Sequence, residues 1–310
     1  MPAPKDAPYF YDLDIEFRAS WEERQLEIEG TPIRIQLQVL DGLVWVAECY
    51  YQLVDAFDER AVARKRTIQT ALRQTLQRET ESPDTLIEEY TILILQNTVS
   101  PPGNFVDEHA AALSHLMRSL TKPLGEADTT GILNSRASYS KQDLTVVDWS
   151  GAIIICEDGD FQSDIELLKI GKYQLLRYRL MDQTVQELLQ EVRQHVPSVR
   201  IKWLPSPNKT LQTIVEQRLS LLLDFEKIDQ SLLLIGDWYS AQVYQIIVNR
   251  YGLNDWKALV SMKLDSLAAI DESIREYLTF SWRRLIDSIV FVGWFILLIG
   301  YFILFFIGLR

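Results

Sequence analysis

The chain has 310 residues, of which 47% are hydrophobic and 24% are charged. This composition argues against general disorder, and the length allows one large or two modest domains with buried cores. The formal net charge of -12 argues against DNA, RNA or an anionic surface as a general partner, because phosphate binding depends on clustered Lys and Arg. We therefore expect no nucleic-acid partner.

The first half of the chain mixes strand-like and helix-like segments. Runs rich in β-branched and aliphatic residues, typical of buried strands, occupy residues 33–51, 91–96 and 144–156. Helices are expected at 59–80 and 104–120, and turns at 99–104 and 125–131. The alternation predicts an α+β domain over residues 1–158, with a small mixed sheet. The cysteines, Cys49 and Cys156, lie in apolar sequence and are expected to be buried thiols.

The helix expected at 59–80 is the main local exception to the acidic composition. Its basic residues are Arg60, Arg64, Lys65, Arg66, Arg73 and Arg78, beside Glu59 and Glu79. Such a charge run favours a solvated face or pairing within the chain. The alternative is a docking surface for an acidic partner.

Residues 159–287 carry helical periodicity almost without strand signals. Ser163 and Glu166 form a capping-box pattern at the start of a long helix that is expected to end before Pro197. A second helical run covers about 208–250, and an apolar stripe with steps of three or four residues follows from Leu253 to Leu285. This pattern predicts long antiparallel helices forming a hairpin or stalk. A compact bundle lying flat against a membrane is the alternative.

Residues 288–309 are uncharged and apolar throughout. At ~1.5 Å per residue such a helix is roughly 33 Å long, which matches a bilayer core of about 30 Å. Arg283 and Arg284 precede the run and Arg310 follows it, so the positive-inside rule predicts a single-pass, tail-anchored membrane protein whose N-terminal body is cytoplasmic, at the inner membrane if bacterial. The bilayer is then a partner of the chain.

Within this run, glycines recur on one helix face at Gly293, Gly300 and Gly308. Small residues on one face permit close helix packing, which would support a homo-oligomer or a membrane partner. Glycine is also simply common in membrane helices.

The motifs of nucleotide-binding, zinc-protease, thiol-redox and serine-hydrolase sites are absent from the sequence. We therefore predict no catalytic, cofactor-binding or metal-binding residues. Asp148 and Ser150 are candidates for a polar pocket or for backbone hydrogen bonds at a strand irregularity. Further candidates are Asp182 with Arg177 or Arg179, as an ion pair fixing helix register, and Gly236 with Asp237, as a kink or close-packing point.

The region from about residue 139 to the end resembles a group of uncharacterised bacterial C-terminally anchored membrane proteins. More distantly, it is similar in layout to the mitochondrial "required for meiotic nuclear division" family. The resemblance rests on DLTVVDWSGAIII, IELLKIGKYQLLRYRLMD, LLLIGDWYSAQVYQIIVNRYGLNDW and KLDSLAAIDESIREYL. It implies architecture and membrane placement, with support or anchoring of the translation machinery in the mitochondrial relatives, and no catalytic residue.

The leading functional hypothesis is a non-enzymatic, tail-anchored scaffold or assembly factor that recruits a protein partner, alone or as a homo-oligomer. The first alternative is a membrane-bound enzyme or ligand sensor with a pocket near Asp148. The second is a subunit of a pore or transporter complex. A deep pocket lined by Asp148, Asp182 and an arginine would favour the enzyme, whereas a filled core would favour the scaffold.

Overall fold

A computed structural model describes residues 17–40, 44–58, 60–79, 86–96, 98–120, 125–157, 159, 161–199, 223 and 238–308. For residues 17–22, 126–127, 191–199, 268, 270–288 and 302–308 it describes the backbone alone. The chain divides into two compact units. Unit 1 comprises Met1–Met181 and Leu223–Ala258, and unit 2 comprises Asp182–Leu222 and Leu259–Arg310.

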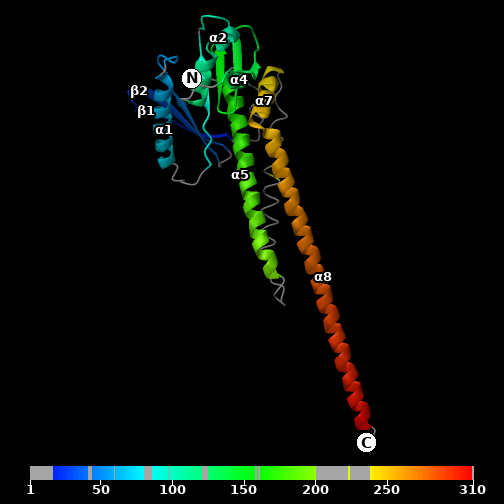
Figure 1. The fold of residues 1–310 in the computed structure, drawn as a ribbon. Helices are drawn as coiled ribbons and strands as arrows, with labels where there is room; N and C mark the ends of the chain where they lie inside the picture. The colour runs from blue at the N-terminus through cyan, green and yellow to red at the C-terminus, as the bar shows by residue number, and fades with distance from the viewer. Residues whose placement is uncertain are drawn as a thin grey trace. The chain divides into compact units, whose positions relative to one another are not determined.

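The first sheet of unit 1 is an antiparallel meander backed by one helix (Figure 1). Its elements are β1 (Phe17–Ile28), β2 (Thr31–Leu40), β3 (Val44–Tyr50) and α1 (Ala61–Glu79). Glu29 and Gly30 join β1 to β2 with positive φ at both residues, the geometry of a tight hairpin turn. Ile33, Ile35 and Leu37 alternate along β2 and pack on Ile68 and Leu72 of α1. The apolar residues at every second position of β2 thus face the apolar side of α1.

The second sheet of unit 1 has the order β4-β7-β6-β5. Its strands are β4 (Thr91–Leu95), β5 (Arg136–Ala137), β6 (Asp143–Val147) and β7 (Gly151–Cys156). β4 pairs parallel with β7, and β6 pairs antiparallel with both β7 and β5. Every residue of β7 is buried, as expected for a central strand covered on both faces.

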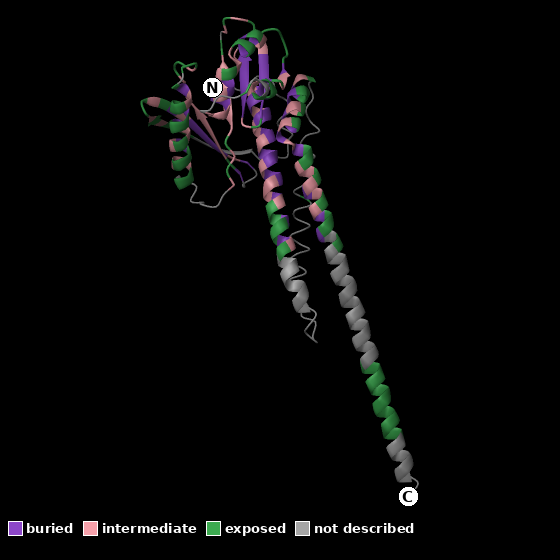
Figure 2. Cartoon of the chain, in the orientation of Figure 1, coloured by how far each residue is buried: buried purple, intermediate pink, exposed green. Residues whose placement is uncertain are grey.

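Three short helices supply one core of this sheet: α2 (Pro102–Glu108), α3 (Ala110–Arg118) and α4 (Glu126–Leu133). Buried residues of this core include Val106, Leu113 and Met117 from the helices, and Val146 and Ile153 from the strands. The purple core of Figure 2 follows these strands. The sheet therefore has a closed apolar interior.

Two longer helices also belong to unit 1, in part or in whole. They are α5 (Gln162–Val199), whose residues to Met181 lie in unit 1, and α7 (Trp238–Tyr251). The two helices approach so closely at Gly171 that a Cβ there would lie 2.3 Å from Cγ2 of Ile247. The absent side chain at residue 171 therefore allows α7 to pack on α5.

In unit 2, α5 continues from Asp182 and α8 (Leu253–Gly308) continues from Leu259. The Nζ atom of Lys263 lies 2.5 Å from Oδ1 of Asp182, which joins the two helices by an ion pair. The sequence predicted that Asp182 pairs with Arg177 or Arg179, which lie on the same helix, α5. The structure divides the chain inside α5 and α8, whereas the sequence predicted boundaries at 158 and 287.

The prediction of a membrane-spanning helix at 288–309 is wrong for the part of the chain that the structure describes, where no helix is both long enough and apolar enough to cross a bilayer. The predictions of a single-pass, tail-anchored protein with a cytoplasmic body rested on a membrane span at 288–309. The same finding therefore contradicts them. Arg310 and the side chains of Arg283, Arg284 and residues 302–308 lie outside the described residues.

Candidate functional site

The candidate site is built around the turn from β6 to β7, with the sequence Asp148-Trp149-Ser150. The backbone N–H of Asp148 donates to the carbonyl of Gly151 at 2.8 Å and closes the turn. Tyr90 donates its hydroxyl to the carbonyl of Asp148 at 3.1 Å, and the N–H of Thr91 donates to the carbonyl of Ser150. The turn is therefore held by the segment that leads into β4. Asp148 lies at the end of a strand, not inside one.

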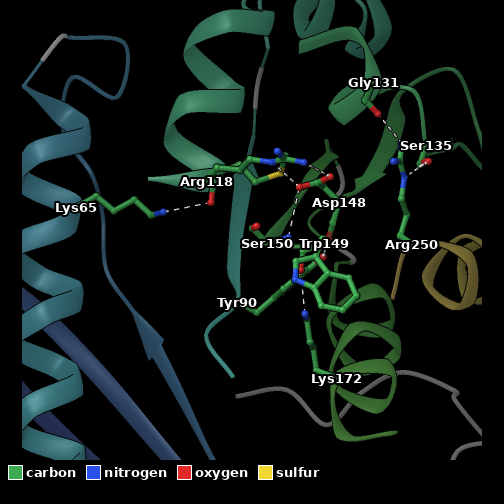
Figure 3. Close-up of polar contacts among 11 residues, drawn as sticks. Lys65, Tyr90, Arg118, Gly131, Ser135, Asp148, Trp149, Ser150, Lys172 and Arg250 are labelled. Atoms are coloured by element: carbon green, nitrogen blue, oxygen red, sulfur yellow. Dashed lines mark hydrogen bonds and ion pairs between the residues drawn. The ribbon is translucent and has the colours of Figure 1, made fainter. Parts of the chain in front are cut away.

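Asp148 is 2% exposed and forms a two-pronged ion pair with Arg118, the last residue of α3 (Figure 3). Nε of Arg118 lies 2.8 Å from Oδ2, and its terminal nitrogen lies 2.8 Å from Oδ1. The N–H of Ser150 adds a longer bond of 3.4 Å to Oδ2. Bidentate pairing of this kind combines charge with fixed geometry. Both carboxylate oxygens are thus engaged within the chain.

A buried lysine holds the end of α3 that carries Arg118. Lys65 of α1 is 2% exposed, and its Nζ donates to the carbonyl of Leu116 at 2.6 Å and to Oγ of Ser119 at 2.7 Å. A cation suits the negative end of a helix. Ser119 ends the helix with a φ of 53°, a left-handed cap. Lys65 therefore stabilises the turn from which Arg118 reaches Asp148.

On the other side of the turn, Lys172 of α5 lies among aromatic rings. Its Nζ is 4.3 Å from the ring centroid of Tyr251, 4.8 Å from that of Tyr90 and 5.1 Å from that of Trp149. It donates to the carbonyl of Trp149 at 2.9 Å. Cation-π attraction stabilises an ammonium in such a box. Burial nevertheless lowers the pKa of Lys172 to about 8, partly offset by the charge of Asp148.

The other predicted candidates lie apart from this turn or have partners of their own. Arg179 pairs with Glu88, whose other oxygen lies 3.9 Å from Lys172. Arg177 is 9% exposed on α5. Asp182 pairs with Lys263 in unit 2. The structure therefore places Asp148 and Ser150 in one turn, and gives Asp148 and Asp182 a separate cation each.

The sequence also singled out four glycines and one aspartate. Gly236 and Asp237 lie outside the described residues. A Cβ at Gly293 or Gly300 would meet no atom of the described part of this chain within 4 Å. Their packing against a second copy or a membrane partner stays a prediction. Gly308 is the last residue of α8, and its surroundings are outside the described part.

A second polar cluster was not predicted from the sequence. Tyr239, at the start of α7, donates its hydroxyl to Oδ2 of Asp164 at 3.0 Å, and Thr145 donates to the same oxygen. Tyr239 touches two exposed rings, Tyr139 from the turn between β5 and β6, and Trp238. The sequence carries the aromatic residues of this cluster in the motifs SYS and DWYS, but it does not show that they are exposed or that they meet.

The N-terminal part of the chain matches a known family model. Residues 25–162 match the model described as "Uncharacterized protein MJ0711, N-terminal domain". A curated relative, "Uncharacterized protein MJ0711" of Methanocaldococcus jannaschii, is 25% identical over 211 residues, which cover 67% of this chain. The chain thus resembles an uncharacterised protein family. The chain spans 63% of the length of that relative. No solved structure matches the chain.

Most of the turn network falls inside the matched residues. Lys65, Tyr90, Arg118 and Asp148 lie within 25–162, whereas Lys172 lies beyond its end. The relative's name states no function. The comparisons therefore support the similarity to an uncharacterised family, and they assign no function.

Buried Lys65 and half-buried Lys172 predict how the stability of unit 1 changes with pH. Burial lowers the pKa of both Lys65 and Lys172 from 10.5 to about 8, so above pH 8 the unfolded chain binds more protons than the folded chain. Stability should therefore rise from pH 8 to pH 9, by about 1 kcal/mol for each lysine. Above pH 9 the effect is opposed, because burial raises the pKa of Cys49 from 9.0 to about 11.

The measurement is urea unfolding of the full chain at about pH 8 and about pH 9. Unfolding is followed by pulse labelling of the buried Cys156 thiol in β7. A Cys49→Ser background restricts the reading to this thiol. Lys65→Met and Lys172→Met should each remove about half of the rise. A stability that is flat or falls across this interval in the parent chain would contradict the prediction.

Proposed function

We propose that this chain is a non-enzymatic scaffold or assembly factor that recruits a protein partner through unit 1. The observation that carries the proposal is that the charged groups around the Asp148 turn are already bonded to other groups of the chain. Both oxygens of Asp148 are bonded to Arg118, and the ammonium of Lys172 is occupied by a carbonyl and by three rings. A catalytic carboxylate needs access to a substrate proton or a metal, and this one has neither oxygen free.

The same residues have a good structural role. The network joins α1, α3, α5 and the β6–β7 turn through side chains that are fixed at both ends. Polar networks that are fully satisfied rigidify a core and specify one arrangement. A rigid unit suits a protein that presents a constant surface to a partner. The alternative, an enzyme or ligand sensor with a pocket near Asp148, stays a prediction that this geometry disfavours.

Similarity to an uncharacterised family adds no activity to this proposal. The distant likeness in layout to the mitochondrial "required for meiotic nuclear division" family also stays a prediction. It agrees with a supporting role but contributes no residue to it.

The test is to purify the tagged full chain from its source cells under non-denaturing conditions and to measure the mass of the complex by light scattering. We expect a second protein, or further copies of the chain, at a fixed ratio. A Gly151→Ala chain, in which β7 is expected to separate from β4 at the start of their ladder, should lose the partner, whereas Gly131→Ala should keep it. Recovery of the parent chain as a clean monomer would contradict the proposal.

A further inference from the structure

Two large aromatic side chains are stacked on the surface of unit 1 with most of their area in water. Tyr139 is 66% exposed and Trp238 is 62% exposed, and their ring centroids are 6.0 Å apart with planes 24° from parallel. Together with Tyr239, whose ring meets both edge-on, they form what we name the aromatic surface. Exposed Trp and Tyr are enriched where proteins bind one another.

The rings are held in place by the structure beneath them. Asp143 accepts the backbone N–H groups of Tyr139 at 2.7 Å and Ser140 at 2.9 Å, which fixes the turn that carries Tyr139. Tyr239 is anchored to Asp164, and burial together with that carboxylate raises the pKa of its hydroxyl. Trp238 is the first residue of α7. The aromatic surface is thus presented by a fixed turn and by helix α7, which lowers the entropy lost on binding.

The charge of unit 1 indicates the chemistry of the partner. Acidic and basic residues are nearly balanced in unit 2, so the chain's net charge of -12 lies essentially in unit 1. An acidic unit attracts a basic partner over a distance set by the ionic strength. Close to the rings, Lys141 lies in the same turn as Tyr139 and adds a positive charge there. The contact itself must therefore come from the rings, and the attraction from the whole unit.

We propose that the aromatic surface is the docking site for an arginine-bearing segment of a protein partner. A guanidinium stacks on Trp and Tyr faces more readily than a lysine ammonium, because it is planar and weakly hydrated. This inference rests on the proposed recruitment function and names its surface and the chemistry of its partner.

The test uses the full chain and a fluorescent nine-residue peptide of Arg-Gly-Gly repeats, with binding followed by anisotropy. Trp238→Ala should weaken binding about tenfold, as loss of a partly desolvated cation-π contact predicts. Trp238→Phe, which keeps a ring, should weaken it less. Trp45→Ala is the matched control, because Trp45 of β3 is also 61% exposed in unit 1 and should leave binding unchanged.

The charge component is tested separately. Lys141→Glu should tighten binding, and raising the salt concentration should weaken it, because both alter attraction to a cationic peptide. Equal binding of a Glu-Gly-Gly peptide, no binding of the arginine peptide to the parent chain, or the same affinity in Trp238→Ala would each overturn the inference. A normal circular dichroism spectrum for Trp238→Ala shows that a loss is not due to unfolding.

Co-purification of a partner from cells distinguishes the proposed recruitment function from the proposed docking site. If a partner co-purifies equally with the parent and the Trp238→Ala chains, the recruitment function stands and the aromatic surface is wrong. If the arginine peptide binds as expected but the chain from cells carries no partner, the recruitment function is wrong and the aromatic surface stands as a binding site for arginine.

Discussion

Replacing Gly151 with alanine is expected to lower the free energy of unfolding of unit 1 by about 2 to 4 kcal/mol. A Cβ at this position would lie 2.5 Å from the carbonyl oxygen of Thr91 and 2.5 Å from Cγ of Met117. Met117 can rotate away, but the Thr91 carbonyl belongs to the backbone of β4, which pairs with β7 at this residue. The methyl group must therefore separate β7 from β4 at the start of their ladder.

The measurement is urea unfolding of the full chain, read at the buried Cys156 thiol. Gly131→Ala is the matched control, because a Cβ there meets no atom within 4 Å and the residue lies in α4. Alanine in a helix is favoured over glycine, so this control should be neutral or more stable by up to about 1 kcal/mol. Equal stability of Gly151→Ala and the parent chain would show that β4 and β7 can separate at no cost.

Replacing Arg118 with methionine is expected to lower the free energy of unfolding of unit 1 by about 3 kcal/mol. The change keeps much of the aliphatic stem but leaves Asp148, which is 2% exposed, without its cation. Losing one member of a buried pair costs more than the pair itself contributes, because a desolvated charge remains. Part of Arg118 reaches water, since its side chain is 32% exposed, so the low end of the range for buried pairs applies.

Arg73→Met is the matched control for Arg118→Met. Arg73 pairs with Glu89, but these side chains are 50% and 47% exposed, and such surface pairs contribute about 0 to 1 kcal/mol. Arg118→Lys should fall between the parent chain and Arg118→Met, because an ammonium restores the charge but not the two-pronged geometry. Similar losses for Arg73→Met and Arg118→Met would contradict the role given to the buried pair.

The strongest apolar runs of the sequence were read correctly as strands, but their turns were missed. Residues 33–51 and 144–156 are each two antiparallel strands, β2 with β3 and β6 with β7. The first run contains Asp41-Gly42, a hairpin signal, and the second contains Asp148-Trp149-Ser150-Gly151. Residues 104–120 are likewise two helices, α2 and α3, which meet at His109. A run of apolar residues gives the element type more readily than its ends.

Two elements escaped prediction because their sequences are polar. β1 has charged residues at Glu23 and Glu27, with exposure that alternates along the strand, as suits a sheet edge. α4 has the sequence EADTTGIL, which contains turn-forming residues, yet its Ile132 and Leu133 are buried in the core of the second sheet. Here tertiary packing outweighs weak local preference. The second helical run at 208–250 lies mostly outside the described residues, except for Leu223 and the residues from Trp238 on.

The candidate site was predictable only in part. Asp148 is conspicuous as a carboxylate inside an apolar run and was singled out for that reason, although the structure places it just after the strand rather than within it. Arg118 and Lys172 come from helices whose approach to the turn depends on the completed fold, so no local pattern connects them with Asp148. The exposure of Trp238 is equally invisible in sequence, because an aromatic residue at a helix start is as readily buried as exposed.

During synthesis, the parallel pairing of β4 with β7 imposes a delay. The ribosome releases the apolar stretch TILIL of β4 well before Gly151–Cys156, its pairing partner in the second sheet. The hairpin of β6 and β7 can form locally, but β4 must wait for that hairpin and then join its open edge. Nascent chains that stall between these points would expose an unpaired aliphatic strand, the kind of segment that chaperones protect and that aggregates without them.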